Sequence, residues 1–268
     1  MLDLDAYLSR IGFSGPRQPT LQTVNALVEA HARSIPFENL DVLLGKPIAL
    51  DLESLERKLV GARRGGYCFE QNALLLAMLE QLGFHVRPLS ARVRVRQPRE
   101  YTPPRTHLFV RLKLDGQSWL ADVGVGGNTL TSVLRLEAGL EQPTPHETRR
   151  LLQEDGRWFH QALLGTEWQD ICEFTLEEMP PIDREVANWF TSAHPQSHFK
   201  SRLVVARALP NGGRANILNR ELTIRRRDGT ADHRMLESPE ELLSVLDEHF
   251  GLHFEPGTRF SCPALDWP

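Results

Sequence analysis

The chain has 268 residues, of which 41% are hydrophobic and 25% are charged, as in an ordinary globular protein. This length suits one large domain or two to three small ones. The formal net charge of −4 at pH 7 argues against nucleic acid as a partner, because nucleic-acid-binding proteins usually present a strongly basic surface.

Residues 1–83 are predicted to be helical. Apolar residues recur at helical spacing in four segments: residues 4–11, 21–31, 52–59 and 73–82. Asp51 can cap the third helix, and Gly83 is a natural residue to end the fourth. His31 falls on the apolar stripe of the second helix, so we interpret it as a hydrogen-bonded core residue rather than a metal ligand.

The start of the chain and the cysteines bear on its location. Residues 1–5 are acidic and lack the basic start and apolar core of a signal peptide, and no apolar run is long enough to span a bilayer. Cys68, Cys172 and Cys262 are far apart, which disfavours a disulfide framework or a structural zinc site. We therefore expect a cytoplasmic protein with no membrane partner and no metal. The pattern predicts no particular oligomeric state.

The run 63–72, RRGGYCFEQN, joins a glycine pair to a single cysteine just before the fourth helix. Cys68 is expected in the first helical turn, where free N–H groups and the helix dipole favour an anion. The adjacent Arg63 and Arg64 are expected to favour the thiolate too, which makes Cys68 a candidate nucleophile. The alternative is a small buried hydrophobic residue, the usual state of a lone cysteine. This stretch alone does not decide between the two.

Residues 84–178 change to a β pattern. Residues 84–95 alternate as a strand, an Asp-Gly pair within 151–159 indicates a hairpin, and 168–174 reads as a further strand. The loop 97–105 holds three prolines and is predicted to be exposed. Together these segments predict a small barrel or an open sheet.

The hairpin at residues 107–123 is the most informative part of this region. Two alternating strands flank an Asp-Gly pair, the signal of a two-residue turn, and such a turn fixes the register so that Val110 faces Ala121. His107 is then the diagonal neighbour of Asp122 on the other face of the hairpin, about 7–8 Å away at the backbone. An imidazole and a carboxylate therefore point the same way, as the base and its orienting group must for a nucleophilic cysteine.

A glycine-rich loop, Gly124-Val125-Gly126-Gly127-Asn128, follows this hairpin. Such a loop after a strand can let a phosphate approach its backbone. Its spacing is neither a Walker loop nor a dinucleotide fingerprint, so a simple tight turn is the alternative.

Residues 179–268 are predicted to mix helices and strands. Two prolines mark the boundary near residue 180, and a short helix at 183–190 follows. Four strands are expected at residues 203–209, 214–219, 221–226 and 231–236. Ser238 begins a capping box with proline at the first helical position, and Gly251 can end that helix.

Three of these segments, residues 63–72, 105–108 and 121–124, resemble the catalytic motifs of the arylamine N-acetyltransferases. Two more, residues 36–40 and 194–199, resemble further family segments, so the resemblance spans nearly the whole chain in the right order. It implies a Cys68–His107–Asp122 triad on an α+β fold related to papain-like cysteine proteases and transglutaminases. The implied parts are a helical bundle carrying the nucleophile (1–83), a β-barrel-like domain carrying His and Asp (84–178), and an α/β lid (179–268).

The resemblance also implies the substrates and their binding residues. Acetyl-CoA would be the cosubstrate, and an arylamine, arylhydrazine or arylhydroxylamine would accept the acetyl group by a ping-pong mechanism through an acetyl-cysteine. Pocket residues for the acceptor would be Phe37, Phe199 and Val125, where many family members carry Phe at the last position. Glycines bordering the coenzyme A would be Gly124, Gly126 and Gly127. Glu38 would pair with Arg64 to hold the loop before the cysteine.

Other functions stay open at this point. A cysteine hydrolase or transglutaminase-like enzyme could use the same triad, although the papain-type sequence around the cysteine is absent and the Cys-to-His separation is far shorter. An amide synthase would use another acyl donor. A non-catalytic binding module would keep the three residues for structural reasons alone.

Overall fold

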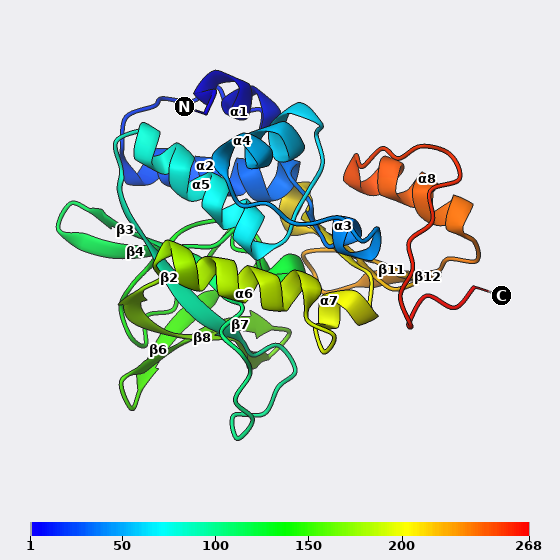
Figure 1. Cartoon of the computed structure of the whole chain (residues 1–268). Helices are drawn as coiled ribbons and strands as arrows, with labels where there is room; N and C mark the ends of the chain where they lie inside the picture. Colours follow the sequence, from blue (N-terminus) through cyan, green and yellow to red (C-terminus); the bar gives the residue numbers. More distant parts are fainter. Residues whose placement is uncertain (1, 268) are drawn as a thin grey trace.

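The computed structural model describes residues 2–267 of the chain (Figure 1). Helices occupy the first part, and they are α1 (Leu4–Arg10), α2 (Leu21–Ser34), α3 (Leu40–Leu43), α4 (Leu52–Leu55) with a π-helical turn (Glu56–Gly61), and α5 (Cys68–Gln81). This confirms the four predicted helices and adds α3, together with a two-residue strand, β1 (Phe37–Glu38). His31 bonds to Tyr7 and Gln71 in the core, as predicted.

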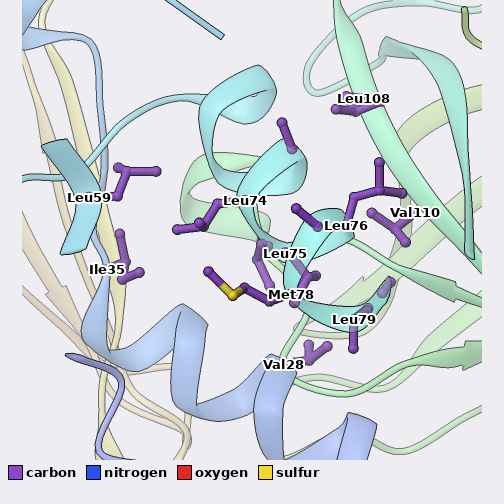
Figure 2. Packing of buried hydrophobic residues seen from close by; sticks show 14 of the residues in the cluster. Val28, Ile35, Leu59, Leu74, Leu75, Leu76, Met78, Leu79, Leu108 and Val110 are labelled. Atoms are coloured by element: carbon purple, nitrogen blue, oxygen red, sulfur yellow. The ribbon is translucent and has the colours of Figure 1, made fainter. Parts of the chain in front are cut away.

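Helix α5 is the centre of the first part. A helix that is apolar on all sides must be buried, and the side chains of Leu74, Leu75 and Met78 are indeed fully inaccessible to solvent. Figure 2 shows residues of α2, of the π-helical turn and of the strand carrying Leu108 and Val110 packed around it. The surrounding core therefore holds the start of α5, and with it Cys68, in a fixed place.

Seven antiparallel strands form the middle sheet, in the order β5-β4-β3-β2-β8-β7-β6. They are β2 (His85–Val93), β3 (His107–Leu114), β4 (Gln117–Ala121), β5 (Leu134–Arg135), β6 (Arg149–Glu154), β7 (Arg157–Leu164) and β8 (Glu167–Glu178), with a 3-10 turn, η2 (Gly126–Asn128), before β5. The segment after β5 forms isolated bridges, from Ala138 and Gln142, to β6 at the other edge of the sheet.

The predicted register of the β3–β4 hairpin is confirmed, since Val110 pairs with Ala121 and Leu114 with Gln117. One expectation about this hairpin is wrong. Strand β4 ends at Ala121 rather than residue 123, because the backbone N–H of Val123 donates to the side chain of Asn72 in helix α5 instead of to β3. An apolar cluster containing Phe109 covers the face that carries His107.

A five-stranded sheet, in the order β1-β9-β10-β11-β12, forms the third part. Its elements are α6 (Pro181–Ala193), α7 (His198–Ser201), β9 (Val204–Ala208), η3 (Pro210–Gly212), β10 (Arg214–Leu218), β11 (Glu221–Arg225), β12 (Ala231–Met235) and α8 (Pro239–Phe250). The four predicted strands are confirmed, and α6 is longer than predicted at both ends, since it begins at Pro181 and continues to Ala193. Helix α8 is capped by Ser238 as predicted and buries Leu246 and Phe250 against this sheet. Within residues 2–267, no helix combines the length and apolar character needed to cross a membrane.

A buried cluster of charges joins the two sheets. Glu147 accepts hydrogen bonds from Arg149 of β6, Arg214 of β10 and Arg225 of β11. Arg149 and Arg214 also donate to the backbone carbonyls of residues 128–129, at the end of the glycine-rich loop. The carboxylate of Glu147 thus holds three guanidinium groups in place, and two of these bind the end of the glycine-rich loop.

We expect Glu147→Gln to lower the free energy of unfolding by about 3 kcal/mol at pH 7, because two buried guanidinium groups, those of Arg149 and Arg214, and the partly exposed one of Arg225 would lose the carboxylate that they share. Burial alone would raise the pKa of Glu147, but Arg214, Arg149 and Arg225 hold it well below its usual range. A lowered pKa stabilises the fold above about pH 4.5, and this stabilisation is lost as the pH falls further.

Urea unfolding at pH 7 and at pH 4 measures both effects. The difference between wild type and Glu147→Gln should be largest at pH 7 and shrink at lower pH. Glu137→Gln removes the half-exposed partner of Arg135 and should change little at either pH. Equal stabilities of wild type and Glu147→Gln at pH 7 would contradict the structural role of this cluster.

Candidate active site

Cys68 is the first residue of α5, as the sequence predicts. It is only 4% exposed, and its thiol lies 3.3 Å from the backbone carbonyl of Thr106. The side chain of Glu70 accepts the N–H of Tyr67 and so caps the helix one residue before the cysteine. The nucleophile candidate therefore sits at a capped helix start, beside the residue that precedes His107.

The two arginines before Cys68 do not support a thiolate as expected. The guanidinium of Arg64 bonds to Glu38 at 2.6 Å and to Asp41 at 3.2 Å, and the side chain of Arg63 is exposed. The predicted Glu38–Arg64 pair is thus confirmed. Because two carboxylates already compensate the charge of Arg64, the arginine holds the loop rather than the sulfur.

His107 and Asp122 form a buried pair, with 2.8 Å between Nε2 and Oδ2 and almost no exposure of either side chain. Burial alone would lower the pKa of His107, but the charge and hydrogen bond of Asp122 outweigh burial and, with a smaller contribution from Cys68, raise it to about 10. Burial would raise the pKa of Asp122, yet the neighbouring His107 lowers it overall. At neutral pH the imidazole is therefore held as an imidazolium beside a carboxylate.

Gly124 lets the hairpin that carries His107 and Asp122 lie close to Cys68, because it has no side chain. A Cβ added at Gly124 would lie 2.7 Å from the Cα of Cys68, so any larger residue would push the hairpin away from α5. The structure thus places Cys68, His107 and Asp122 in one buried cluster. This arrangement can hold a thiolate against an imidazolium, with the carboxylate behind the ring.

A second thiol, which the sequence analysis did not connect with this cluster, lies behind the pair. Within residues 2–267, one group of possible metal ligands has all its atoms within 4.8 Å of one another: His107, Asp122 and Cys172. A metal here would have to replace the hydrogen bond between His107 and Asp122. Burial raises the pKa of the Cys172 thiol far above its usual value, so it stays protonated. Cys172 lies in β8, opposite Val93 of β2 and His160 of β7, and no local sequence pattern signals that this pairing brings it here.

Two of the three expected acceptor-pocket residues lie together. The rings of Phe37 and Phe199 are 5.9 Å apart in an edge-to-face contact, and Tyr67 lies 5.4 Å from Phe199. Sequence reasoning missed Tyr67, although an aromatic residue directly before the nucleophile was the available signal. Val125 instead packs against the core of the middle sheet.

The glycines expected at coenzyme A have structural reasons of their own. Gly124 is required by the close approach to α5, and a Cβ at Gly127 would lie 2.5 Å from Oδ1 of Asn216 in the third part. Gly126 has a positive φ of 65° and lies against the ring of Phe37. The loop is therefore packed between all three parts of the chain.

The chain is similar to known proteins along most of its length. The family model described as N-acetyltransferase matches residues 20–259. The arylamine N-acetyltransferase of Mycolicibacterium smegmatis is 45% identical over 255 residues, covering 94% of this chain and 92% of that protein. The enzyme of Escherichia coli K12 is 43% identical over 249 residues, covering 93% of this chain and 88% of that protein.

Solved structures give the same result. The structure of Mycobacterium marinum arylamine N-acetyltransferase in complex with CoA is similar with a TM-score of 0.89 and 41% identity, covering 93% of this chain and 92% of that one. The relatives are thus matched over nearly their whole length, in sequence and in fold. The chain belongs to the arylamine N-acetyltransferase family.

Proposed function

We propose that the protein transfers an acetyl group from acetyl-CoA to a small arylamine, arylhydrazine or arylhydroxylamine. The observation that carries this proposal is the buried cluster of Cys68, His107 and Asp122. The family supplies the reaction class, and a similar solved structure is a complex with CoA. No observation favours a hydrolase, an amide synthase or a binding module over this function.

The proposed chemistry has two halves. The thiolate of Cys68 attacks the acetyl carbonyl, a new C–S bond forms, and the C–S bond to coenzyme A breaks as His107 protonates the leaving thiolate. In the second half, the nitrogen of the amine attacks the carbonyl carbon of acetyl-Cys68 while the neutral imidazole takes a proton from that amine. The bond between the acetyl carbon and the sulfur then breaks, and Cys68 is released as a thiolate. Asp122 keeps the ring oriented and stabilises its charged form throughout. The N–H of Cys68, at the helix start, is a candidate donor to the oxyanion.

The proposal also assigns a separate role to each of the three parts of the chain. Residues 1–83 would supply the nucleophile, 84–178 the His–Asp pair, and 179–268 a lid. The contact between the rings of Phe199 and Phe37 supports this role of residues 179–268, because it puts a residue of the third part at the acceptor pocket. In this proposal Val125 lines the acceptor pocket, and Gly124, Gly126 and Gly127 form the loop that borders coenzyme A. Three free cysteines support a cytoplasmic location.

Mass spectrometry after incubation with acetyl-CoA alone tests this function. We expect one acetyl group on the peptide containing Cys68, because the first half-reaction needs no acceptor. With an acceptor such as an aniline or an arylhydrazine, double-reciprocal plots at several acetyl-CoA concentrations should be parallel. Intersecting lines and an unmodified Cys68 peptide would sink the proposal.

A further inference from the structure

Asn72 lies one helical turn after Cys68, on the same side of α5, and the steps above give it no role. Its side chain is completely buried. Nδ2 donates to the carbonyl of Leu108 at 2.7 Å and to Oδ1 of Asp122 at 2.8 Å, while Oδ1 accepts the N–H of Val123 at 2.9 Å. Both amide hydrogens and the amide oxygen are therefore used, and every partner belongs to the hairpin that carries the His–Asp pair.

The backbone fixes which way this amide points. The carbonyl of Leu108 can only accept and the N–H of Val123 can only donate, so a flipped Asn72 amide would lose both bonds. The NH₂ group must therefore face Asp122. Asp122 then has Oδ1 held by Asn72 and by the N–H of Gly124, which leaves Oδ2 for His107.

We propose that Asn72 is a positioning residue for the triad: it fixes the carboxylate of Asp122 so that one oxygen faces His107, and it holds the end of the hairpin on the nucleophile helix. This proposal rests on the proposed function of Cys68, His107 and Asp122. An amide suits the role because it donates to the carboxylate without neutralising the charge that the imidazolium needs. A lysine or arginine at this place would compete with His107 for that charge.

Gln71 provides a matched comparison, because it is an equally buried amide in the same turn of α5. Its Nε2 donates to the carbonyls of Ile35, Pro36 and Gly66, and its Oε1 bonds to His31. None of these bonds reaches His107 or Asp122. Removing either amide costs buried hydrogen bonds, but only Asn72 acts on the His–Asp pair.

The test measures the rate of Cys68 alkylation by iodoacetamide against pH in full-length Asn72→Ala, Gln71→Ala and wild type. For Asn72→Ala we expect the pH midpoint to rise by about one unit, which means roughly tenfold slower alkylation below the midpoint. The reason is that a carboxylate free to turn away no longer holds the imidazolium beside the sulfur. Gln71→Ala should lose a similar amount of thermal stability while keeping the wild-type midpoint.

Loss of the amide also makes the carboxylate of Asp122 more basic, which would favour the imidazolium and lower the midpoint. An unchanged or lowered midpoint in a folded Asn72→Ala protein, or equal shifts in the Asn72→Ala and Gln71→Ala proteins, would therefore overturn the positioning role. If the alanine variant does not fold, Asn72→Ser replaces it, since serine fills part of the space with a polar group but is too short to reach Asp122.

A double variant separates action through Asp122 from general disruption. In an Asp122→Asn background, Asn72→Ala should cause no further shift of the midpoint, whereas its effect on thermal stability should persist. A further shift of the full size would contradict the proposal. Because alkylation needs no acetyl donor, this readout stays valid even if acetyl-CoA proves not to be the substrate, which the mass-spectrometric experiment decides independently.

Discussion

Cys68→Ser is expected to reduce acetyl transfer by more than about 10³-fold, the largest effect of any single substitution in this chain. A serine hydroxyl is far less acidic than a thiol, so the imidazolium of His107 cannot hold it as an anion at neutral pH. The remaining hydrogen bonds of the site persist, so the fold should be unaffected. The measurement is coenzyme A released per minute from acetyl-CoA in the presence of an arylamine, with the acetylated peptide mapped in parallel.

The other two cysteines serve as controls for this substitution. Cys262→Ala, at a half-buried position near the end of the chain, should keep full activity. Cys172→Ala should cost stability, because it leaves a void in the core of the middle sheet, but Cys68 should still be acetylated. Transfer by purified Cys68→Ser at more than a few per cent of the wild-type rate would show that another group is the nucleophile.

Asp122→Asn is expected to lower the rate of transfer by about 10²- to 10⁴-fold while the protein stays folded. The amide removes the negative charge that raises the pKa of His107 to about 10, so burial then dominates and the ring becomes neutral near pH 7. A neutral imidazole no longer stabilises a thiolate at Cys68. Alkylation of Cys68 by iodoacetamide at pH 7 should therefore slow sharply.

The same substitution should change how stability depends on pH. A raised pKa of His107 stabilises the wild-type fold fully below about pH 6.5, and this stabilisation is lost as the pH rises through about 10. Chemical unfolding at pH 6.5 and pH 9.5 should show this decline in wild type and a flatter profile in Asp122→Asn. Unchanged alkylation together with an unchanged pH profile would mean that Asp122 does not act on His107.

Local patterns predicted the elements of this site well. An Asp-Gly pair fixes a two-residue turn, and a fixed turn sets the register that aligns His107 with Asp122. A glycine pair before an apolar run marks the start of α5, where Cys68 lies. In both cases the determining interactions are between residues close in the sequence.

Contacts between distant segments could not be predicted in the same way. Residues 37–38 are too few to show a strand pattern, yet they form the edge of the sheet built by the last third of the chain. The role expected of Arg64 was wrong because its two carboxylate partners lie more than twenty positions earlier. The proximity of Cys172 to Asp122 depends on the pairing of β8 with β2, two strands that lie far apart in the sequence.

The pairing of β1 has a consequence for when the enzyme can first work during synthesis. Phe37 pairs with Ala206 of β9 and also forms a bridge with Gly66, and Glu38 donates its N–H to the carbonyl of Gly66. The loop before Cys68 is therefore held by β1, and β1 is held by β9, a strand that the ribosome makes much later. Contacts so far apart in sequence form late in folding. A nascent chain that exposes Cys68 before β9 is made therefore lacks the strand that supports the loop before the nucleophile.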